Sequence, residues 1–228
     1  MAITLITGAN RGIGRMLAQF SAARGDTVYG AARNADGAAA IKALQAHGAV
    51  TPVTLDVTDP AGAETLSRAL GDGGIDLLVC NAGALIGRGG IDDPAYTAEA
   101  WAAQLMTNVA GPFFTARAFL PQLERAGGKI AIISSIMGCD SRARGSAYAY
   151  RASKAAATNL ARNLAVELKA RGVAVGAYHP GWVRTDMGGD AAEISVEESA
   201  AGLLARFDAL SPATTGVVED WRGEPLPD

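Results

Sequence analysis

Short apolar runs alternate with longer helical patterns along the chain. The apolar runs show no alternation with polar residues, which is typical of parallel strands covered by helices on both faces. They lie at residues 3–7, 27–32, 49–55, 75–80, 129–134 and 173–178. The helical patterns lie at residues 12–24, 35–46, 60–70, 97–125, 148–171 and 196–207. This alternation predicts right-handed βαβ units, and therefore an α/β fold with one doubly wound parallel sheet.

Length and composition fit one domain of this Rossmann type over residues 1–228. The chain is 49% hydrophobic and 19% charged, so it can bury a sizeable core, and residues 216–218 can add an edge strand. A net charge of −3 argues against nucleic acid or an anionic membrane as a partner. No apolar stretch reaches the ~18 residues of a membrane span. Two isolated cysteines and no apparent signal peptide predict a cytoplasmic protein without a metal site.

The first chemical signal is a glycine-rich turn, TGANRGIG, at residues 7–14. Gly8 permits a tight turn with positive φ, while Gly12 and Gly14 let the backbone approach a phosphate. The helix that begins here offers free N–H groups and its positive dipole end to a pyrophosphate. The spacing departs from the GxGxxG fingerprint, and such a turn can also be structural punctuation. Its place in the first βαβ unit favours a dinucleotide-binding turn.

The end of the second predicted strand indicates which dinucleotide would bind. NAD-binding proteins carry an acidic residue there, which contacts the ribose 2′-hydroxyl. Here the strand ends in TVYGAARN, so Arg33 follows and no carboxylate is present. Arg33 and Arg11 can both reach a 2′-phosphate, and one opposite charge at ~4 Å is attracted by roughly 4 kcal/mol at an effective dielectric of 20, before desolvation costs. The charges of Arg33 and Arg11 favour NADP(H) over NAD(H). The alternative is that both residues are ordinary surface arginines.

A tyrosine and a lysine share one face of the helix predicted at 148–171. Tyr150 lies four residues before Lys154, whereas Tyr148 lies six before it and is expected to be a pocket-wall or packing aromatic. A free tyrosine has a pKa of ~10, and we expect the fixed ammonium group to lower it. A tyrosine tuned in this way is a competent general acid for a carbonyl oxygen that receives a hydride. Because Tyr-x-x-x-Lys also occurs as an ordinary solvated pair, the surrounding motifs decide whether this pair is catalytic.

Six motifs in a fixed order surround this pair. They are the glycine turn, NAG (81–83), Asn108 in TNVAGPF, the serines 134–135, YRASK (150–154) and HPGWVRT (179–185). With these motifs the chain resembles the short-chain dehydrogenase/reductase family over residues 3 to about 187. HPGWVRTDMGG and YAYRASKAA most resemble its C-factor-like, sniffer-like and carbonyl-reductase-like branch. The resemblance implies hydride transfer between NADP(H) and a small-molecule carbonyl or alcohol substrate.

The resemblance also implies a role for each matched position. Tyr150 would donate the proton, Lys154 would tune it and bind the nicotinamide ribose, and Ser135 would hold the substrate oxygen. Asn108 would support a water linked to Lys154. The implied cofactor contacts are Gly8, Asn10, Arg11, Gly12, Ile13 and Gly14 at the turn, Arg33 at the phosphate, Asp56 and Val57 at the adenine, Asn81, Ala82 and Gly83 along the floor, and Pro180, Gly181, Val183 and Thr185 at the carboxamide.

The substrate serine is one of two. Ser135 precedes Tyr150 by fifteen residues, two more than the family's commonest spacing, although the intervening loop can absorb the difference. Neighbours on a strand point to opposite faces, so only one of Ser134 and Ser135 faces the pocket. We expect it to be Ser135.

Three further expectations concern the surroundings of the site. A short Gly- and Ala-rich segment at about 186–200 is expected to form a substrate lid over a permissive pocket. Surplus apolar residues at 97–125 and 148–171 predict a homodimer or homotetramer. The alternative function is a signalling or redox-sensing protein that binds the cofactor with little turnover. A sensor has no physical need for the Tyr150–Lys154 pair, which counts against that alternative.

Overall fold

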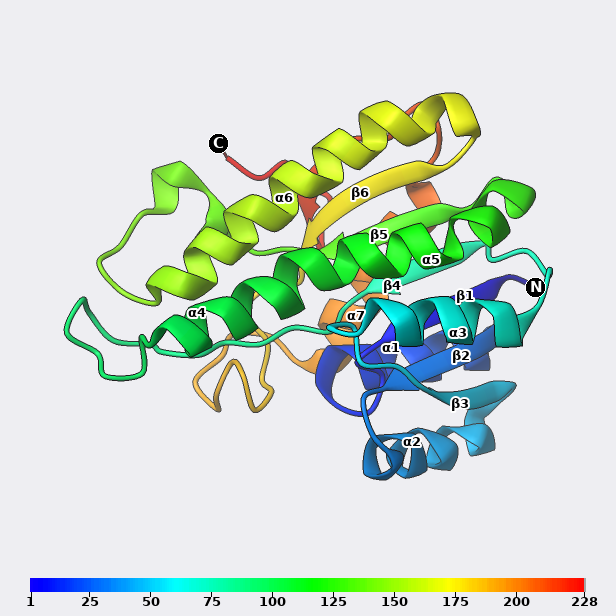
Figure 1. Cartoon of the computed structure of the whole chain (residues 1–228), viewed down its shortest axis with the longest axis horizontal. Coiled ribbons are helices and arrows are strands. Elements are labelled where there is room, and N and C mark those ends of the chain that lie inside the picture. The colour runs from blue at the N-terminus through cyan, green and yellow to red at the C-terminus, as the bar shows by residue number, and fades with distance from the viewer. Residues whose placement is uncertain (228) are drawn as a thin grey trace.

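A computed structural model describes residues 1–227 and contains a seven-stranded sheet between two layers of helices (Figure 1). The strands are β1 (Ile3–Thr7), β2 (Thr27–Ala32), β3 (Val50–Thr54), β4 (Leu77–Cys80), β5 (Lys129–Ile133), β6 (Ala174–His179) and β7 (Val218–Asp220). Their order is β3-β2-β1-β4-β5-β6-β7, and every pairing is parallel. The predicted doubly wound parallel sheet is confirmed. Its order reverses between β1 and β4, where open α/β sheets bind ligands.

Seven α-helices pack on this sheet in the part of the chain that the structure describes. They are α1 (Gly12–Ala23), α2 (Ala35–Lys42), α3 (Pro60–Leu70), α4 (Ala98–Leu105), α5 (Gly111–Ala126), α6 (Tyr148–Leu168) and α7 (Val196–Ala209). In Figure 1, α3, α5 and α6 lie in front of the sheet, and α1 and α7 lie behind it. Leu5 enters the core on one face and Ile6 the core on the other, and both are fully buried. This two-sided burial explains why the strands are apolar throughout.

Several predicted boundaries differ from the structure. The helix expected at 35–46 ends as an α-helix at Lys42 and continues as a 3₁₀ turn over Ala43–His47. The helix expected at 97–125 contains a π-helical turn, Met106–Ala110, between α4 and α5. The edge strand expected at 216–218 forms at Val218–Asp220 instead.

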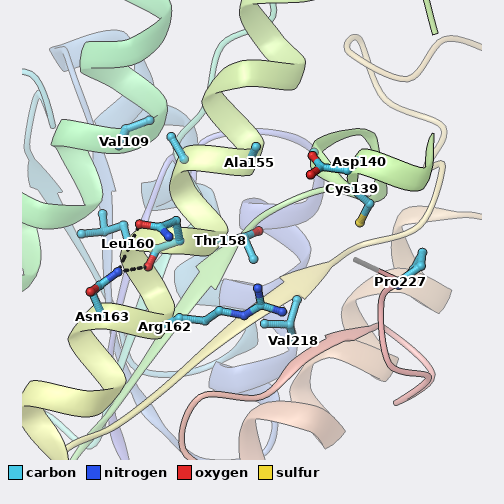
Figure 2. Close-up of a pocket in the computed structure, with 13 residues that line it drawn as sticks. Val109, Cys139, Asp140, Ala155, Thr158, Leu160, Arg162, Asn163, Val218 and Pro227 are labelled. Carbon is cyan, nitrogen blue, oxygen red and sulfur yellow. Dashed lines mark hydrogen bonds between the residues drawn. The ribbon is translucent and has the colours of Figure 1, made fainter. Parts of the chain in front are cut away.

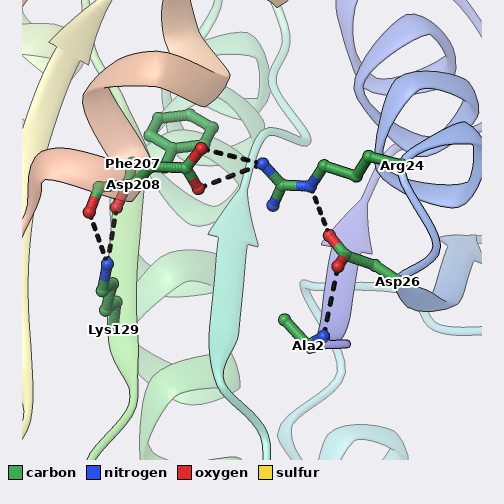
Figure 3. A network of polar contacts seen from close by, with 6 residues as sticks. All are labelled: Ala2, Arg24, Asp26, Lys129, Phe207 and Asp208. Atoms are coloured by element: carbon green, nitrogen blue, oxygen red, sulfur yellow. Dashed lines mark hydrogen bonds and ion pairs between the residues drawn. The ribbon is translucent and has the colours of Figure 1, made fainter.

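A charged network closes the end of the sheet opposite to the site described below (Figure 3). The Arg24 guanidinium donates to the Asp26 carboxylate at 2.6 Å and to both Asp208 oxygens at 3.0 Å. Asp26 also accepts from the backbone N–H of Ala2 at 3.1 Å. Lys129 Nζ donates to the Asp208 carbonyl at 2.9 Å, where it satisfies a free carbonyl near the end of α7. These contacts join α1, α7 and the starts of β1 and β5.

Candidate active site

The predicted site residues gather at the carboxyl ends of the strands. The glycine turn follows β1, Arg33 follows β2, Asn81 follows β4, and Ser135 follows β5. In Figure 1 the loops after β4, β5 and β6 extend from the same end of the sheet, at the left of the view. Parallel pairing brings these segments together, since all carboxyl ends of a parallel sheet lie at one edge.

The glycine turn has the geometry of an anion cradle. Gly8 and Gly12 adopt φ of 66° and 50°, the left-handed region that glycine tolerates best. At Gly14 a Cβ atom would lie 2.3 Å from both the Asn81 side-chain nitrogen and the Gly8 carbonyl, so no side chain fits there. No side chain caps the first turn of α1 at its N-cap residue, Arg11. The free N–H groups of this turn therefore remain available to a phosphate.

Asn81 braces the glycine turn from β4. Its side-chain amide donates to the carbonyls of Thr7 at 2.9 Å and Gly8 at 3.2 Å. The Thr7 hydroxyl in turn accepts from the backbone N–H groups of Asn81 and Ala82, both at 3.0 Å. The Asn81 amide therefore binds the backbone of the glycine turn. Gly83, two residues farther along, lies beside Lys154, because a Cβ atom added at Gly83 would be 3.9 Å from Lys154 Nζ. Sequence reasoning did not single out Thr7, which links the two strands.

The two arginines proposed for the phosphate differ in their surroundings. Arg33 is exposed and has no hydrogen-bond or ion-pair partner within residues 1–227. Arg11 pairs with the Asp186 carboxylate at 3.1 Å, and both side chains are largely exposed. Asp56, expected at the adenine, accepts from the Thr58 backbone N–H at 2.9 Å and from its hydroxyl at 2.7 Å. Arg33 is therefore the freer cation at this edge of the sheet.

Tyr150 and Lys154 lie on one buried face of α6, as their spacing predicts. They are 8% and 5% exposed, and Lys154 Nζ lies 5.6 Å from the centre of the Tyr150 ring. Lys154 Nζ donates to the Ile133 carbonyl at 2.7 Å, which fixes it against the end of β5. Burial lowers the pKa of Lys154 to about 8, because desolvation disfavours its charged form.

The expected lowering of the Tyr150 pKa is not what the protein chain produces by itself. Burial raises the pKa of Tyr150, and this effect outweighs a hydrogen bond with Ser135 and the charge of Arg88, which both lower it. The sequence pattern predicted Ser135 as a neighbour of this hydroxyl, but not the burial of Tyr150 or the charge of Arg88. The Tyr150 hydroxyl is therefore held in its protonated form at neutral pH.

The structure separates the two candidate serines. The Ser134 hydroxyl donates to the Lys154 carbonyl at 3.1 Å and contacts the Thr158 hydroxyl at 2.6 Å, so it packs β5 onto α6. The Ser135 side chain instead lowers the pKa of Tyr150, and its hydroxyl accepts from the Met137 backbone N–H at 3.1 Å. This geometry favours Ser135 as the serine that faces the pocket.

Asn108 lies in the π-helical turn between α4 and α5 and is 2% exposed. Its side chain accepts from the Ala84 N–H at 2.8 Å and donates to the Ala84 carbonyl at 2.9 Å. It also donates to the Ser153 hydroxyl at 2.9 Å, and Ser153 donates to the Tyr150 carbonyl at 2.7 Å. Asn108 therefore ties the loop after β4 to the backbone that carries Tyr150. π turns often mark functional sites, and none was expected from the sequence.

The segment after β6 folds back on itself. Val183 is buried and pairs with Ile194, and Pro180 accepts from the Ser199 hydroxyl at 2.6 Å. The Thr185 hydroxyl accepts from the Gly188 N–H at 3.1 Å. Because α7 begins at Val196, only residues 186–195 of the expected lid form a loop.

Arg88, which sequence reasoning missed, also belongs to this region. It lies in the loop after β4, and its Nη2 atom donates to the Met187 carbonyl at 2.7 Å. Its charge lowers the pKa of Tyr150, against the larger effect of burial. A single arginine in a loop has no sequence pattern that could have indicated this position.

A separate groove of about 860 Å³ lies on the outer side of α6 (Figure 2). Its lining includes Cys139, Ala155, Thr158 and Val218. Neither Tyr150 nor Lys154 lines it, so it is distinct from the site built here.

Comparison with known proteins identifies the family. A model described as short chain dehydrogenase matches residues 2–194. The chain belongs to the short-chain dehydrogenase family. It is 35% identical over 211 residues to the 3-oxoacyl-(acyl-carrier-protein) reductase FabG of Escherichia coli, covering 91% of this chain and 82% of that protein. It is 34% identical over 157 residues to the C-signal protein of Myxococcus xanthus, covering 68% and 93% respectively.

Solved structures of short-chain dehydrogenases share the whole fold. The NADPH-bound carbonyl reductase from chicken fatty liver matches with a TM-score of 0.91 and 31% identity, covering 100% of both chains. The carbonyl reductase Sniffer of D. melanogaster also matches with a TM-score of 0.91, at 27% identity, covering 100% of this chain and 99% of that chain. Family membership makes the chain an NAD(P)-dependent oxidoreductase. Its glycine cradle, free helix N-terminus and buried Lys154 fit such a dinucleotide.

Within residues 1–227, no helix is long and apolar enough to cross a membrane.

Proposed function

We propose that this short-chain dehydrogenase reduces an aldehyde or ketone to an alcohol with NADPH, or catalyses the reverse reaction, with Tyr150 as the general acid or base. One observation carries the proposal. Tyr150 and Lys154 are buried on one face of α6, next to Ser135 and at the strand edge that also holds the glycine cradle. A purely structural role would not require a buried ammonium group beside a buried phenol.

Ser135, Tyr150 and Lys154 would each have a different role around the carbonyl oxygen of the substrate. A bound reduced nicotinamide supplies the hydride. Ser135 holds the oxygen by a hydrogen bond, and Tyr150 delivers its proton to it. Because burial raises the pKa of Tyr150, the hydroxyl is protonated at neutral pH and suited to reduction. Lys154, anchored on the Ile133 carbonyl, would hold a positive charge beside Tyr150 and bind the nicotinamide ribose.

Asn108 would hold Tyr150 and Lys154 in position. Its hydrogen bonds reach Ala84 and, through Ser153, the Tyr150 backbone, so it would position Tyr150 and support the water expected to connect Lys154 to solvent. This positioning role follows because the hydrogen bonds run without a break from Ala84 through Asn108 and Ser153 to the Tyr150 carbonyl.

The proposed preference for NADP(H) rests on Arg33. It follows β2, is exposed, and lacks a protein partner within the described residues, as expected for a cation that meets a 2′-phosphate. Arg11 would assist it if its exposed pair with Asp186 opens, which costs little because exposed ion pairs contribute only ~0–1 kcal/mol. The NADPH named with the chicken carbonyl reductase supports the same assignment.

The experiment follows NADPH consumption by absorbance with a panel of aldehydes, ketones and quinones, and with NADH in parallel. The Tyr150→Phe variant should lose at least ~100-fold in kcat while it keeps its affinity for NADPH, since only the proton donor is removed. Tyr148→Phe is the matched control, because Tyr148 packs edge-on against Tyr96 at 5.9 Å. Equal turnover of Tyr150→Phe and wild type would refute the assignment.

A second candidate function is signalling or redox sensing with little turnover. The observation that favours it is the 34% identity with the C-signal protein of Myxococcus xanthus. A sensor predicts that NADPH binds but that no carbonyl is reduced, and that a cellular phenotype is indifferent to Tyr150→Phe. The same variant therefore discriminates between the two functions.

We also propose that the protein works in the cytoplasm as a homodimer or homotetramer. The exposed apolar residues Leu105, Phe113 and Val166 lie on α4, α5 and α6, where a second copy could cover them. Light scattering at several protein concentrations tests this, and a monomer throughout would contradict it.

A further inference from the structure

The loop that carries Arg88 is fixed by its own hydrogen bonds. One oxygen of Asp93 accepts from the backbone N–H groups of Arg88 at 3.1 Å and Gly89 at 2.7 Å. The other accepts from Ala95 at 2.9 Å, and these bonds lower the pKa of Asp93, so the carboxylate stays ionised at neutral pH. The Tyr96 hydroxyl donates to the Gly89 carbonyl at 2.9 Å. The Arg88 backbone is thus held in one conformation.

The same loop is attached to the start of the helix that carries Tyr150. The Ala147 N–H donates to the Gly89 carbonyl at 3.2 Å, and the Tyr96 hydroxyl accepts from the Tyr148 N–H at 3.2 Å. Ala147 adopts φ of 51°, which is unusual for a residue other than glycine. These contacts hold Arg88 at a defined place relative to Tyr150.

The Arg88 side chain bridges two loops around the pocket. Its Nη2 atom donates to the Met187 carbonyl, 99 residues farther along the chain, at 2.7 Å. The loop of Arg88 contacts the Ala147 and Tyr148 backbone at the start of α6, and the charge of Arg88 lowers the pKa of Tyr150. The guanidinium therefore lies where a substrate on Tyr150 would feel its field.

No carboxylate of the described residues pairs with the Arg88 guanidinium. By contrast, Arg11, at the same end of the sheet, pairs with Asp186. A guanidinium has five N–H donors, and the Met187 carbonyl takes one of those that Arg88 offers. The remaining donors suit a carboxylate, which an arginine binds through two parallel hydrogen bonds.

We propose that Arg88 forms an anion subsite beside Tyr150, and that the preferred substrates are carbonyl compounds that carry a carboxylate. This inference rests on the proposed reductase function and names its substrate class. The carbonyl end would meet Tyr150 and Ser135, and the carboxylate end would bind Arg88 between the loop after β4 and the segment that contains Met187.

The test compares acids with their neutral methyl esters. Levulinate and methyl levulinate, and 4-formylbenzoate and methyl 4-formylbenzoate, present the same carbonyl with and without a charge. In wild type, kcat/KM should favour at least one acid over its ester by ~10-fold or more, because hydrogen bonds to charged groups are the strong ones. Arg88→Gln keeps a donor for the Met187 carbonyl but removes the charge, and should abolish that preference. Arg88→Lys should retain part of it.

Arg68→Ala is the matched control, since this exposed arginine contacts Thr65 within α3 and should leave the ratio unchanged. Equal kcat/KM for every acid and its ester in wild type would overturn the inference. So would an equal loss for acid and ester in Arg88→Gln, which would indicate a role in holding the loops only.

Calorimetric titration of the acids into the complex with NADP⁺ provides a readout that does not need turnover. Binding that is lost in Arg88→Gln supports the subsite even if no ester or acid is reduced, and in that case the reductase function fails alone. Absence of binding together with absence of turnover overturns both. Turnover of esters without any acid preference leaves the reductase function intact and removes the subsite.

Discussion

Alanine substitution of Ser134 should mainly lower stability, whereas alanine substitution of the adjacent Ser135 should mainly lower turnover. Ser134 is 1% exposed and joins β5 to α6 through the Lys154 carbonyl at 3.1 Å and the Thr158 hydroxyl at 2.6 Å. The Ser135 hydroxyl accepts from the Met137 N–H at 3.1 Å, and the same side chain lowers the pKa of Tyr150. We therefore expect the Ser134 hydroxyl to support the fold and the Ser135 hydroxyl to face the substrate.

The expected magnitudes follow from these contacts. Ser134→Ala removes two hydrogen bonds and leaves the Thr158 hydroxyl without its partner, which costs about 2 kcal/mol of unfolding free energy. For a chain of this size that lowers Tm by roughly 4–8 °C. Ser135→Ala should cost about 1 kcal/mol or less in stability. Its loss in kcat should be ~10²–10³-fold, as for other groups that stabilise a developing oxyanion.

Two assays on the same samples decide the matter. Thermal unfolding without cofactor measures stability, and NADPH consumption with the best carbonyl substrate of the panel measures turnover. Cofactor affinity, followed by fluorescence titration, should be close to wild type in both variants. If Ser134→Ala loses more turnover than Ser135→Ala, or if both lose equal amounts, the assignment of the pocket serine is wrong.

Three further predictions concern charge and close packing. Arg33→Ala should weaken NADPH binding at least ~10-fold more than NADH binding, since one arginine–phosphate contact contributes ~1.5–3 kcal/mol; equal losses in Kd would contradict a phosphate site. Because the pKa of Lys154 is about 8 when folded and 10.5 when unfolded, the unfolded chain binds more protons between these values, and the unfolding free energy of wild type should rise over this pH range. In urea titrations at pH 7 and pH 10, Lys154→Met should lack roughly 2–3 kcal/mol of that rise, and an equal rise in the variant and in wild type would exclude the titration. Gly14→Ala places a Cβ 2.3 Å from Asn81 and should abolish NADPH binding and cost roughly 1–3 kcal/mol in stability, whereas Gly73→Ala, with nothing within 4 Å, should do neither; similar effects would mean that the cradle is not closely packed.

Several features of the site could be predicted because they depend on local spacing. Tyr150 and Lys154 share a face since they lie four residues apart on a helix, and the helical burial pattern confirms this. The turn after β1 could be predicted because its glycines tolerate the positive φ that a tight turn needs. The contacts of Arg88 with Met187 could not be predicted, since 99 residues separate them and no periodicity links two loops.

The sequence by itself determined the order of strands and helices along the chain, the parallel sheet and the face of α6 that Tyr150 and Lys154 share. Hydrophobic periodicity and helix geometry act between near neighbours, so they can be read without coordinates. Only the tertiary structure decided that Ser134 packs β5 onto α6, that a π turn holds Asn108, and that burial raises the pKa of Tyr150, which a neighbouring charge was expected to lower. Desolvation and Coulomb interactions act through space and depend on what the folded chain packs around each group, and spacing along the chain does not contain that information.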